Sequence, residues 1–369
     1  EKIAGQKVVV ATVNCTLYPE GHEPFKIKKS KIRGEVSEGM ICAEDEIGLG
    51  ASHDGIMVLD TDVPNGTPAA EYFDLSSDYI FEIGLTPNRA DGASHFGVAR
   101  DLKALLNREI NLPSVDGFKE GTEDFDISVE NTEACPRYSG LVIKGVEVKA
   151  SPEWLQKRLR ALGINPTNNI VDVTNYILHE LGQPLHAFDL AEVGSKVVIK
   201  TGLEGEKFTT LDDKERTLLV DDLMICNASK PMCIAGTLGG SKSGVKNSTT
   251  DIFLESAYFA ADYVRKTSMK HTIKTDASFR YERGTDPNIT MYAMKRAALL
   301  IQEVAGGTIT SKAIDVYPNP IPDFEFEVKY SYLNTIIGKE LKAEKVGAIL
   351  KSLDIEITST NGDIMNVKV

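Results

Sequence analysis

The first fifth of the chain alternates short apolar runs with polar and turn-forming residues. KVVVATV (7–13), FKIKKSKIRG (25–34) and SEGMICAEDEIGL (37–49) each place apolar residues at alternate positions or in short runs, with glycine, aspartate and proline between them. Alternation with a period of two, broken by turn formers, is typical of half-buried strands. Residues 1–75 are therefore predicted to form a small antiparallel β unit.

A connector follows at residues 76–125. Residues 79–91 read as a strand that runs into a turn, and SHFGVARDLKALLN (94–107) carries apolar residues three and four apart, which predicts a helix. The acidic, glycine-containing PSVDGFKEGTEDF (113–125) then predicts a linker.

The pattern from residue 126 to residue 317 mixes helices with a mainly β core. A helix is expected after Ser151, with this serine as N-cap, Pro152 at the first helical position and Gly163 as the stop. NNIVDVTNYILHELGQPLHAFD (168–189) predicts a helix whose final LHAFD is a strand. The strands expected next are VVIKTG, TLLV, LMICNA, MCIAG and IFLESAYF, and residues 262–305 are expected to be mostly helical.

The proline-rich PNPIPDF (318–324) marks a boundary before the last part of the chain. Residues 318–369 then read as strand, helix, helix and strand, which predicts the start of a small α/β domain. The chain as a whole is expected to be an α+β multidomain protein, because 369 residues exceed what one core ordinarily holds.

The composition excludes some classes of protein but does not indicate a function. The chain is 42% hydrophobic and 26% charged, and no uncharged apolar run approaches the roughly 18–20 residues that a membrane span needs. No basic and apolar leader is visible, so nothing points to export. The five cysteines are scattered, so free thiols and no structural zinc are expected: Cys15, Cys42, Cys135, Cys226 and Cys233.

The charge of the chain is uneven. A net charge of −13 argues against non-specific nucleic-acid binding, which depends on neutralising phosphates. Within residues 26–33, however, five basic side chains occur without an acid: Lys26, Lys28, Lys29, Lys31 and Arg33. They predict either an edge strand that is protected from aggregation or a local contact with phosphates.

Three patterns carry candidate chemistry. Glu255 interrupts the apolar IFLESAYF, where a lone carboxylate costs several kcal/mol unless it is hydrogen-bonded. His186 in GQPLHAFD is either a core histidine or a polar group that meets a substrate. GTLGGSKS (236–243) resembles a phosphate loop, but Ser241 stands where glycine is required and no helix follows, which favours a glycine-rich turn. No Ser-His-Asp, HExxH or GxSxG pattern occurs.

Several of these stretches together resemble the bacterial phenylalanyl-tRNA synthetase beta subunit. They are LTPNRAD with SHFGVARDL, VDVTNYILHELGQPLHAFD, TDASFRYERGTDP (275–287) and FKIKKSKIRG followed by SEGMICAEDEIGL. The resemblance runs in order along essentially the whole chain. It implies a fragment with a partial OB-like tRNA-binding domain (1–75), a connector (76–125), a B3/B4 editing module (126–317) and a truncated B5 domain (318–369).

In this family two alpha and two beta subunits form the ligase (alpha2beta2), and the alpha subunit charges tRNA(Phe) with phenylalanine using ATP and Mg²⁺. The resemblance implies no cofactor or metal in the present residues, because the magnesium-binding acids are expected beyond Val369. It implies that the beta subunit binds tRNA and hydrolyses misattached tyrosine in an editing pocket. The expected partners are the alpha subunit and tRNA(Phe), in the cytoplasm, without DNA or membrane.

The resemblance also assigns roles to residues. Glu255 would accept a hydrogen bond from the phenol of tyrosine, Ala235 and Gly236 would leave room for the ring, and Pro184 would shape the wall. The ester and its attacking water would be surrounded by His186, Thr174 and Asn175. A second pocket is needed because a hydrophobic site rejects an added hydroxyl by only about 100-fold. The alternative is a tRNA-binding and assembly scaffold with a vestigial pocket.

Overall fold

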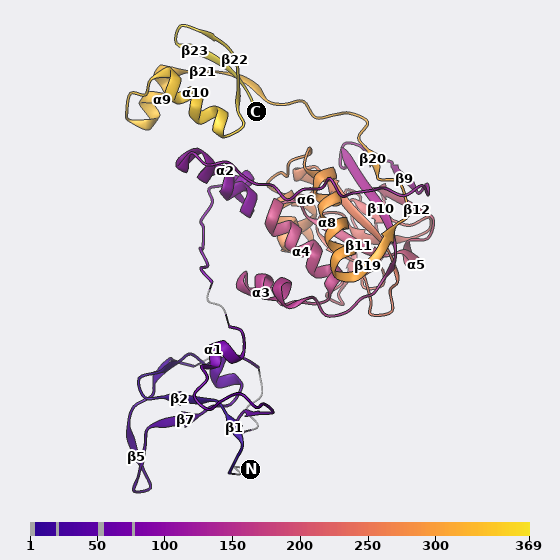
Figure 1. Cartoon of the computed structure of the whole chain (residues 1–369). Helices are drawn as coiled ribbons and strands as arrows, with labels where there is room; N and C mark the ends of the chain where they lie inside the picture. Colours follow the sequence, from indigo (N-terminus) through magenta and orange to yellow (C-terminus); the bar gives the residue numbers. More distant parts are fainter. Residues whose placement is uncertain (1–3, 20–21, 51–54, 76–77) are drawn as a thin grey trace. The chain divides into compact units, whose positions relative to one another are not determined.

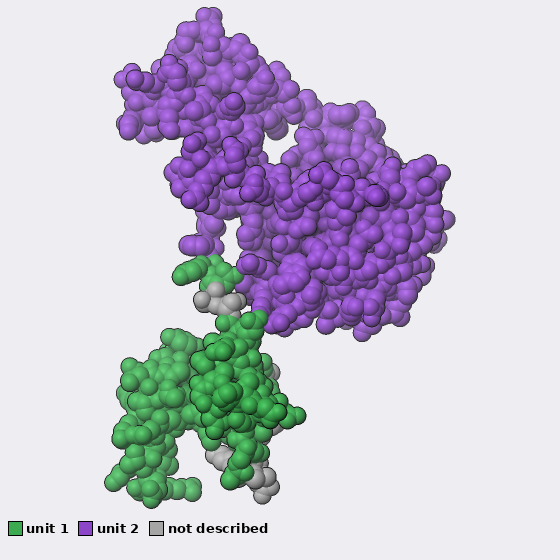
Figure 2. All heavy atoms as spheres, in the orientation of Figure 1, with its two compact units in different colours: residues 1–79 green, residues 80–369 purple. Residues whose placement is uncertain are grey.

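The computed structural model describes residues 4–19, 22–50, 55–75 and 78–369. Contacts divide the chain into two compact units, residues 1–79 and 80–369, which are coloured separately in Figure 2.

The first unit is built from short antiparallel ladders, as the alternating pattern predicts. The pairs are β1 (Lys7–Val8) with β8 (Val58–Leu59), β2 (Val10–Thr12) with β7 (Gly39–Ile41), β3 (Thr16–Leu17) with β4 (Phe25–Lys26), and β5 (Ser30–Ile32) with β6 (Glu35–Ser37). The short 3-10 helix η1 (Asp45–Ile47) and the one-turn helix α1 (Ala69–Tyr72) are the other described elements of this unit. A small core of Ala11, Leu17, Ile27 and Cys42 holds the ladders together.

The second unit begins with a difference from the prediction. Residues 80–86 are described without strand pairing, so the strand expected at the start of 79–91 is wrong, although the turn at Arg89 and η2 (Ala90–Gly92) follows. Alternating apolar residues favour an extended backbone, but a strand needs a neighbouring edge, and none of the described segments supplies one. The helix that follows is confirmed as α2 (His95–Leu106), capped by Ser94 Oγ, which accepts from Gly97 N at 3.0 Å.

Two five-stranded sheets form the centre of the second unit (Figure 1). The first has the order β11-β18-β10-β19, with β20 also paired to β10: β11 (Leu185–Asp189), β18 (Asp251–Tyr258), β10 (Arg137–Val146), β19 (Gly306–Ile309) and β20 (Ile314–Val316). The second has the order β17-β16-β15-β12-β9: β17 (Leu238–Gly239), β16 (Pro231–Ile234), β15 (Met224–Cys226), β12 (Lys196–Lys200) and β9 (Asp126–Val129).

Each face of the first sheet packs against a different layer. The face that carries Leu254 packs against three helices, α3 (Glu153–Ala161), α4 (Asn169–Leu181) and α8 (Thr290–Ala305). The face that carries Phe253 packs against the second sheet. Because successive strand residues point to opposite faces, the apolar run of β18 is buried on both sides. Alternation also places Glu255 on the Phe253 face, as the sequence predicts.

Two local predictions need correction. Helix α3 begins at Glu153, because Pro152 is extended with ψ 152°, and Ser151 does not cap it. The Ser151 hydroxyl donates instead to Asp172 Oδ2 at 2.5 Å, which links the start of α3 to α4. The strand predicted at TLLV is wrong beyond Thr217, where β14 (Glu215–Thr217) ends after pairing with β13 (Lys207–Thr209).

The remaining elements follow the predicted order. Residues 262–305 contain α6 (Ala261–His271), α7 (Asp276–Tyr281) and α8, while α5 (Leu190–Val193) follows β11. The C-terminal part has β21 (Glu325–Lys329), α9 (Tyr330–Ile337), α10 (Ala343–Ser352) and β22 (Glu356–Asn361), and an additional strand, β23 (Ile364–Lys368). All five cysteines are free. Among the described helices, none has the length and apolar character required to span a bilayer.

Candidate functional site

The centre of the candidate site is a pair of polar residues that face each other across two neighbouring strands. His186 on β11 lies directly opposite Glu255 on β18, and Gly140 on β10 lies opposite Glu255 on its other side. Directly opposed residues of an antiparallel pair point to the same face of a sheet. Both side chains therefore lie on the face that packs against the second sheet.

Burial controls the charge of Glu255. The residue is only 4% exposed, and removal from water raises the pKa of its carboxyl to about 8. The phenol of Tyr138 lies near enough to oppose part of this rise. Its geometry is not that of a regular hydrogen bond, since Tyr138 Oη and Glu255 Oε2 both lack a partner among the described residues. At neutral pH Glu255 is thus mainly a neutral carboxylic acid that can donate and accept.

His186 is neutral for the same reason. Its Nε2 atom is buried without a hydrogen-bond partner among the described residues, although the residue as a whole is only half-buried. Burial lowers the pKa of the imidazole to about 4. The ring packs edge-on against Phe188, with 4.4 Å between ring centroids. A neutral imidazole and a protonated carboxyl do not form an ion pair, so each keeps hydrogen-bonding capacity for a third group.

The GTLGGSKS stretch approaches this pair from the second sheet. Gly239 on β17 lies so close to His186 that an added Cβ would meet the imidazole Cε1 at 3.1 Å. Ala235 is 3% exposed and belongs to the core between the sheets. Gly236 has φ +65°, and an added Cβ would meet side chains of Tyr281, Phe259 and Val264 at 2.9–3.1 Å. These three side chains therefore already occupy the space beside Gly236.

Pro184 is fixed by a buried network at the start of β11. Its carbonyl accepts from Gln183 Nε2 at 2.9 Å and from the Tyr281 hydroxyl at 3.2 Å. Both donors also reach the carbonyl of Ala257 on β18, at 2.8 Å and 3.0 Å. Because these bonds connect the two strands one step from the His186–Glu255 pair, they hold its register.

Thr174 and Asn175 lie elsewhere. Both belong to α4, which packs on the sheet face opposite to the Glu255 side chain. The Thr174 hydroxyl donates to the carbonyl of Val171 at 2.7 Å and so satisfies a bond within its own helix. The structure therefore brings together His186, Glu255 and the glycine-rich turn, but not these two residues of the predicted set.

Sequence reasoning missed three residues of the site: Tyr138, Gln183 and Gly239. Tyr138 and Gln183 are fully buried, and Gln183 Oε1, like Tyr138 Oη, has no partner among the described residues. Buried polar atoms without partners are rare, so several at one strand junction mark a place that can hold water or a polar ligand. Alternation along CPRYSG could have assigned Tyr138 to a buried face, but its neighbour Glu255 is 117 residues away in the chain.

The basic residues of the first unit form a separate exposed surface. Lys26, Lys28, Lys29, Lys31 and Arg33 are all exposed. The β5–β6 hairpin turns at Arg33 and Gly34, which have φ +52° and +94°, as a two-residue hairpin of type I′ requires. Lys29 pairs with Glu38, so part of the charge is neutralised locally. Both interpretations of this segment, a protected edge and a phosphate contact, fit this arrangement.

The segment TDASFRYERGTDP (275–287) forms α7 and the turn after it. Arg280 pairs with Asp276 at 3.2 Å, and Arg283 pairs with Glu282, so the charges stabilise the helix locally. Across residues 4–19, 22–50, 55–75 and 78–369, no three His, Cys, Asp or Glu side chains gather as a metal ion would require.

Comparisons with known proteins agree with this architecture. The family model "B3/4 domain" matches residues 134–306, and the model "Putative tRNA binding domain" matches residues 1–68. The phenylalanine–tRNA ligase beta subunit of Bacteroides fragilis is 54% identical over 99% of this chain and 46% of its own length. The subunit of the same name from Salinibacter ruber is 43% identical over 96% of this chain and 44% of its own length.

A solved structure, an N-terminal fragment of the phenylalanyl-tRNA synthetase beta subunit from Pyrococcus horikoshii, aligns at 17% identity with a TM-score of 0.37. It covers 76% of this chain and 78% of that chain.

A tRNA-binding domain followed by a B3/4 domain defines part of an aminoacyl-tRNA synthetase. The chain belongs to the family of phenylalanine–tRNA ligase beta subunits, and it spans about half the length of the curated relatives it matches.

Proposed function

We propose that this chain is the editing portion of a phenylalanine–tRNA ligase and that it hydrolyses tyrosine misattached to tRNA(Phe). In this proposal the complete beta subunit assembles with an alpha subunit as alpha2beta2, and the alpha subunit performs aminoacylation with ATP and Mg²⁺. The chain contributes tRNA binding through its first unit. Aminoacylation of tRNA takes place where proteins are made, so the proposed location is the cytoplasm. The boundaries near residues 75, 125 and 317 stay predictions.

The observation that carries the proposal is the buried carboxyl of Glu255, whose Oε2 has no partner among the described residues and whose pKa burial raises to about 8. A carboxylic acid can accept the phenol hydrogen of tyrosine and donate to the phenol oxygen at once. Phenylalanine offers neither group and would leave the carboxyl without a partner. A site that hydrogen-bonds a hydroxyl can discriminate against the analogue that lacks it by about 10⁴–10⁵.

In this proposal His186 orients the ester rather than removing a proton. An imidazole with a pKa of about 4 is a weak base at neutral pH, whereas an efficient general base has a pKa near the working pH. In the proposed reaction the water oxygen attacks the carbonyl carbon and the bond to the ribose oxygen breaks. One water proton passes to that ribose oxygen, which leaves as a hydroxyl, and free tyrosine and tRNA remain. Neutral His186 can hold the water or the carbonyl in line for this attack.

Thr174 and Asn175 keep a proposed role only as residues that the tRNA end could reach from α4. They are weaker candidates than His186, because α4 packs on the sheet face opposite to the Glu255 side chain and the Thr174 hydroxyl is bonded within its own helix.

Deacylation of Tyr-tRNA(Phe) by the full alpha2beta2 assembly tests the proposal. Glu255→Ala and His186→Ala should each lower kcat/KM by about 100-fold or more, because each removes a polar contact that the substrate needs. Glu147→Ala is a matched control, since Glu147 is exposed and its carboxylate pairs with the exposed Lys149 at 2.7 Å. Unchanged hydrolysis in both site variants would exclude this site and favour the scaffold interpretation.

A further inference from the structure

A cavity of about 200 Å³ opens beside the candidate site, on the second sheet. Its walls come from the start of β13, the start of β16 and the turn after β17. Its lining includes Lys207, Lys230, Lys242, Ser241 and Glu192. A volume several times the roughly 30 Å³ of a water molecule accommodates a phosphate group.

The charge of this cavity is positive. Lys230 and Lys242 are exposed, and neither ammonium forms an ion pair with any residue in the described part of the chain. Lys207 is partly engaged, since its ammonium donates to Thr217 Oγ1 at 2.8 Å and lies 3.4 Å from Glu215. The acid of the lining, Glu192, pairs with Lys246 at 3.5 Å. Two uncompensated ammonium groups therefore remain for a ligand.

The chain itself connects this cavity to His186. Gly239 lies against the imidazole, and the next residue, Gly240, lines the cavity together with Ser241 and Lys242. Gly240 has no room for a side chain, because a Cβ would meet the carbonyl oxygen of Met232 at 2.5 Å and the Phe208 ring at 2.7 Å. The same turn thus places Gly239 against His186 and Lys242 in the lining of the cavity.

We propose that this cavity binds a backbone phosphate of the tRNA 3′ end while the aminoacyl ester lies at His186. The inference rests on the proposed editing function and adds a phosphate site to it. The terminal adenosine carries its own 5′-phosphate one ribose away from the ester oxygen, so a cationic cavity next to the ester site matches its chemistry. Lysine side chains recognise a phosphate as point charges and need no phosphate loop or helix.

This site gives the GTLGGSKS stretch a role that its similarity to a phosphate loop did not reveal. Anion binding by a phosphate loop depends on backbone N–H groups at the start of a helix. Here β17 and a turn replace the helix, and the Lys242 ammonium supplies the charge. Hydroxyl groups of Ser241 and Thr209 in the same lining add hydrogen-bond donors.

The test compares two esters in the full alpha2beta2 assembly carrying Lys230→Met and Lys242→Met together. Tyr-tRNA(Phe) contains the 3′-end phosphates, whereas 2′(3′)-tyrosyl-adenosine has none. The double variant should raise KM for Tyr-tRNA(Phe) about tenfold or more with little change in kcat, and should leave hydrolysis of tyrosyl-adenosine unchanged. The salt dependence of log KM should lose a slope of about 0.7, the value expected for one phosphate of a single strand.

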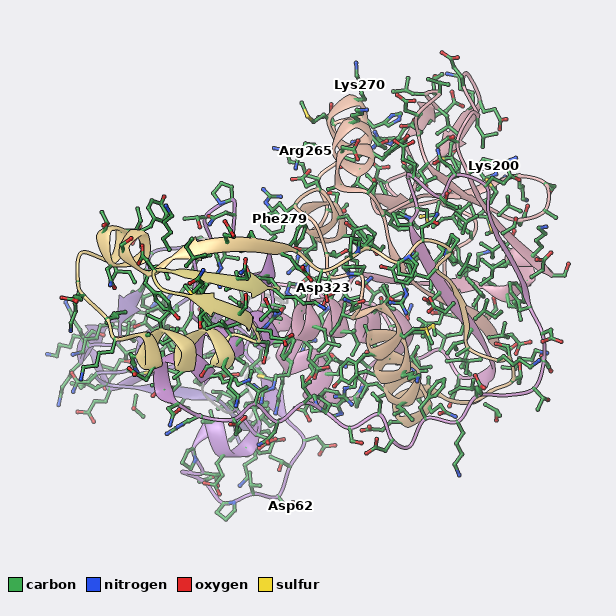
Figure 3. All side chains as sticks on the ribbon, turned by 90° about the horizontal axis from the view of Figure 1, so that it is seen from above. Asp62, Lys200, Arg265, Lys270, Phe279 and Asp323 are labelled. Atoms are coloured by element: carbon green, nitrogen blue, oxygen red, sulfur yellow. The ribbon has the colours of Figure 1, made fainter. Side chains whose placement is uncertain are left out.

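Lys270→Met is the matched control. Lys270 lies at the end of α6, away from the cavity lining, and Figure 3 shows it pointing outward from the protein. Its variant should behave like the wild type with both esters. An equal loss with tyrosyl-adenosine, or no change with Tyr-tRNA(Phe), would overturn the phosphate site.

A direct binding measurement separates this proposal from the editing function. The probe is a fluorescent CCA trinucleotide with normal phosphodiester linkages, so its terminal adenosine carries a 5′-phosphate. It should bind the wild type and the Lys270→Met variant about tenfold more tightly than the double variant. An analogue with neutral methylphosphonate linkages should show no such difference. If the wild-type assembly failed to hydrolyse Tyr-tRNA(Phe) but still showed this binding difference, the editing proposal would fail and the phosphate site would stand. Equal binding by all three proteins would reject the site itself.

Discussion

His186 and Glu255 are opposed in register across β11 and β18, and each carries a buried polar atom without a partner in the described structure. The pKa of the glutamic acid is raised to about 8 and that of the imidazole is lowered to about 4. Both groups are therefore neutral over most of the range between these values. Their chemistry is that of two hydrogen-bonding groups, which fits recognition of an uncharged phenol and ester.

The raised pKa of Glu255 predicts a pH-dependent stability. Its pKa is about 8 in the folded protein and close to the ordinary 4.5 when unfolded, so the folded state binds the proton more tightly. Stability from this group is full below about pH 4.5 and is lost as the pH rises toward 8. Glu255→Gln should therefore gain thermal stability over the wild type as the pH rises through this window, by an amount on the order of a few kcal/mol. Thermal unfolding of the full subunit at pH 5 and pH 8.5 measures it, and a constant difference would contradict the raised pKa.

The same carboxyl should shape the pH dependence of editing. The profile of kcat/KM reports groups of the free enzyme. Loss of the Glu255 proton above about pH 8 removes its donor and adds a charge beside the phenol. Hydrolysis of Tyr-tRNA(Phe) should fall above this pH in the wild type, whereas Glu255→Gln should show no such inflection. An identical alkaline limb in both proteins would assign the inflection to another group.

The role of His186 can be separated by a conservative substitution. Glutamine keeps a hydrogen-bonding side chain but cannot act as a base. If His186 orients the ester, His186→Gln should recover kcat to within about tenfold of the wild type, while His186→Ala should not. A general base would make both variants equally slow, since general base catalysis contributes about 10²–10⁴-fold. Single-turnover deacylation of Tyr-tRNA(Phe) distinguishes the two outcomes.

Gly239 should control the position of the imidazole. Alanine at this position brings a Cβ to 3.1 Å from His186 Cε1 and 2.9 Å from Leu211 Cδ1, so the ring must shift. Gly239→Ala should lower kcat for Tyr-tRNA(Phe) by about tenfold or more, since small displacements of catalytic groups reduce rates strongly. Gly347→Ala, with its nearest neighbour at 3.8 Å, is the control and should leave kcat unchanged. Equal activity of both variants would show that the ring has space to move.

Gly236 should matter for stability instead. An alanine there combines φ +65° with contacts at 2.9–3.1 Å to Tyr281, Phe259 and Val264. Gly163 has a similar φ of +76° but nothing within 4 Å, so Gly163→Ala measures the backbone strain alone. The free energy of unfolding should fall about 1–3 kcal/mol further in Gly236→Ala than in Gly163→Ala, because overpacking adds to the strain. Denaturant titration of both variants checks this, and equal losses would mean that the neighbours adjust.

The basic hairpin of the first unit should bind tRNA electrostatically. Lys28 and Lys31 are exposed, and changing both to methionine should weaken tRNA(Phe) binding most at low salt, because phosphate contacts release counterions. Lys339→Met, an exposed lysine of the C-terminal part, serves as the control. Binding measured between 50 mM and 200 mM salt should show a smaller slope in the double variant. The same slope in all three proteins would support the edge-protection interpretation.

The sequence by itself determined the local structure and much of the chemistry. Periodicity of apolar residues predicted α2, α4, α8 and the buried face of β18, because burial of alternate or every third and fourth residue stabilises those elements directly. The interruption of an apolar strand by Glu255 identified a polar group that needs a partner. The strand expected at residues 79–91 failed because pairing depends on a neighbouring edge, which local pattern does not encode.

Tertiary structure alone decided which residues meet. The register of β11, β18 and β10 brings His186, Glu255 and Tyr138 to one face, although the last two are 117 positions apart in the chain. The layer arrangement places Thr174 on the opposite face, despite its being only twelve residues before His186. Burial between two sheets, which no single segment specifies, sets the pKa values of the pair. The residue types come from the sequence, and their protonation and proximity come from the packing around them.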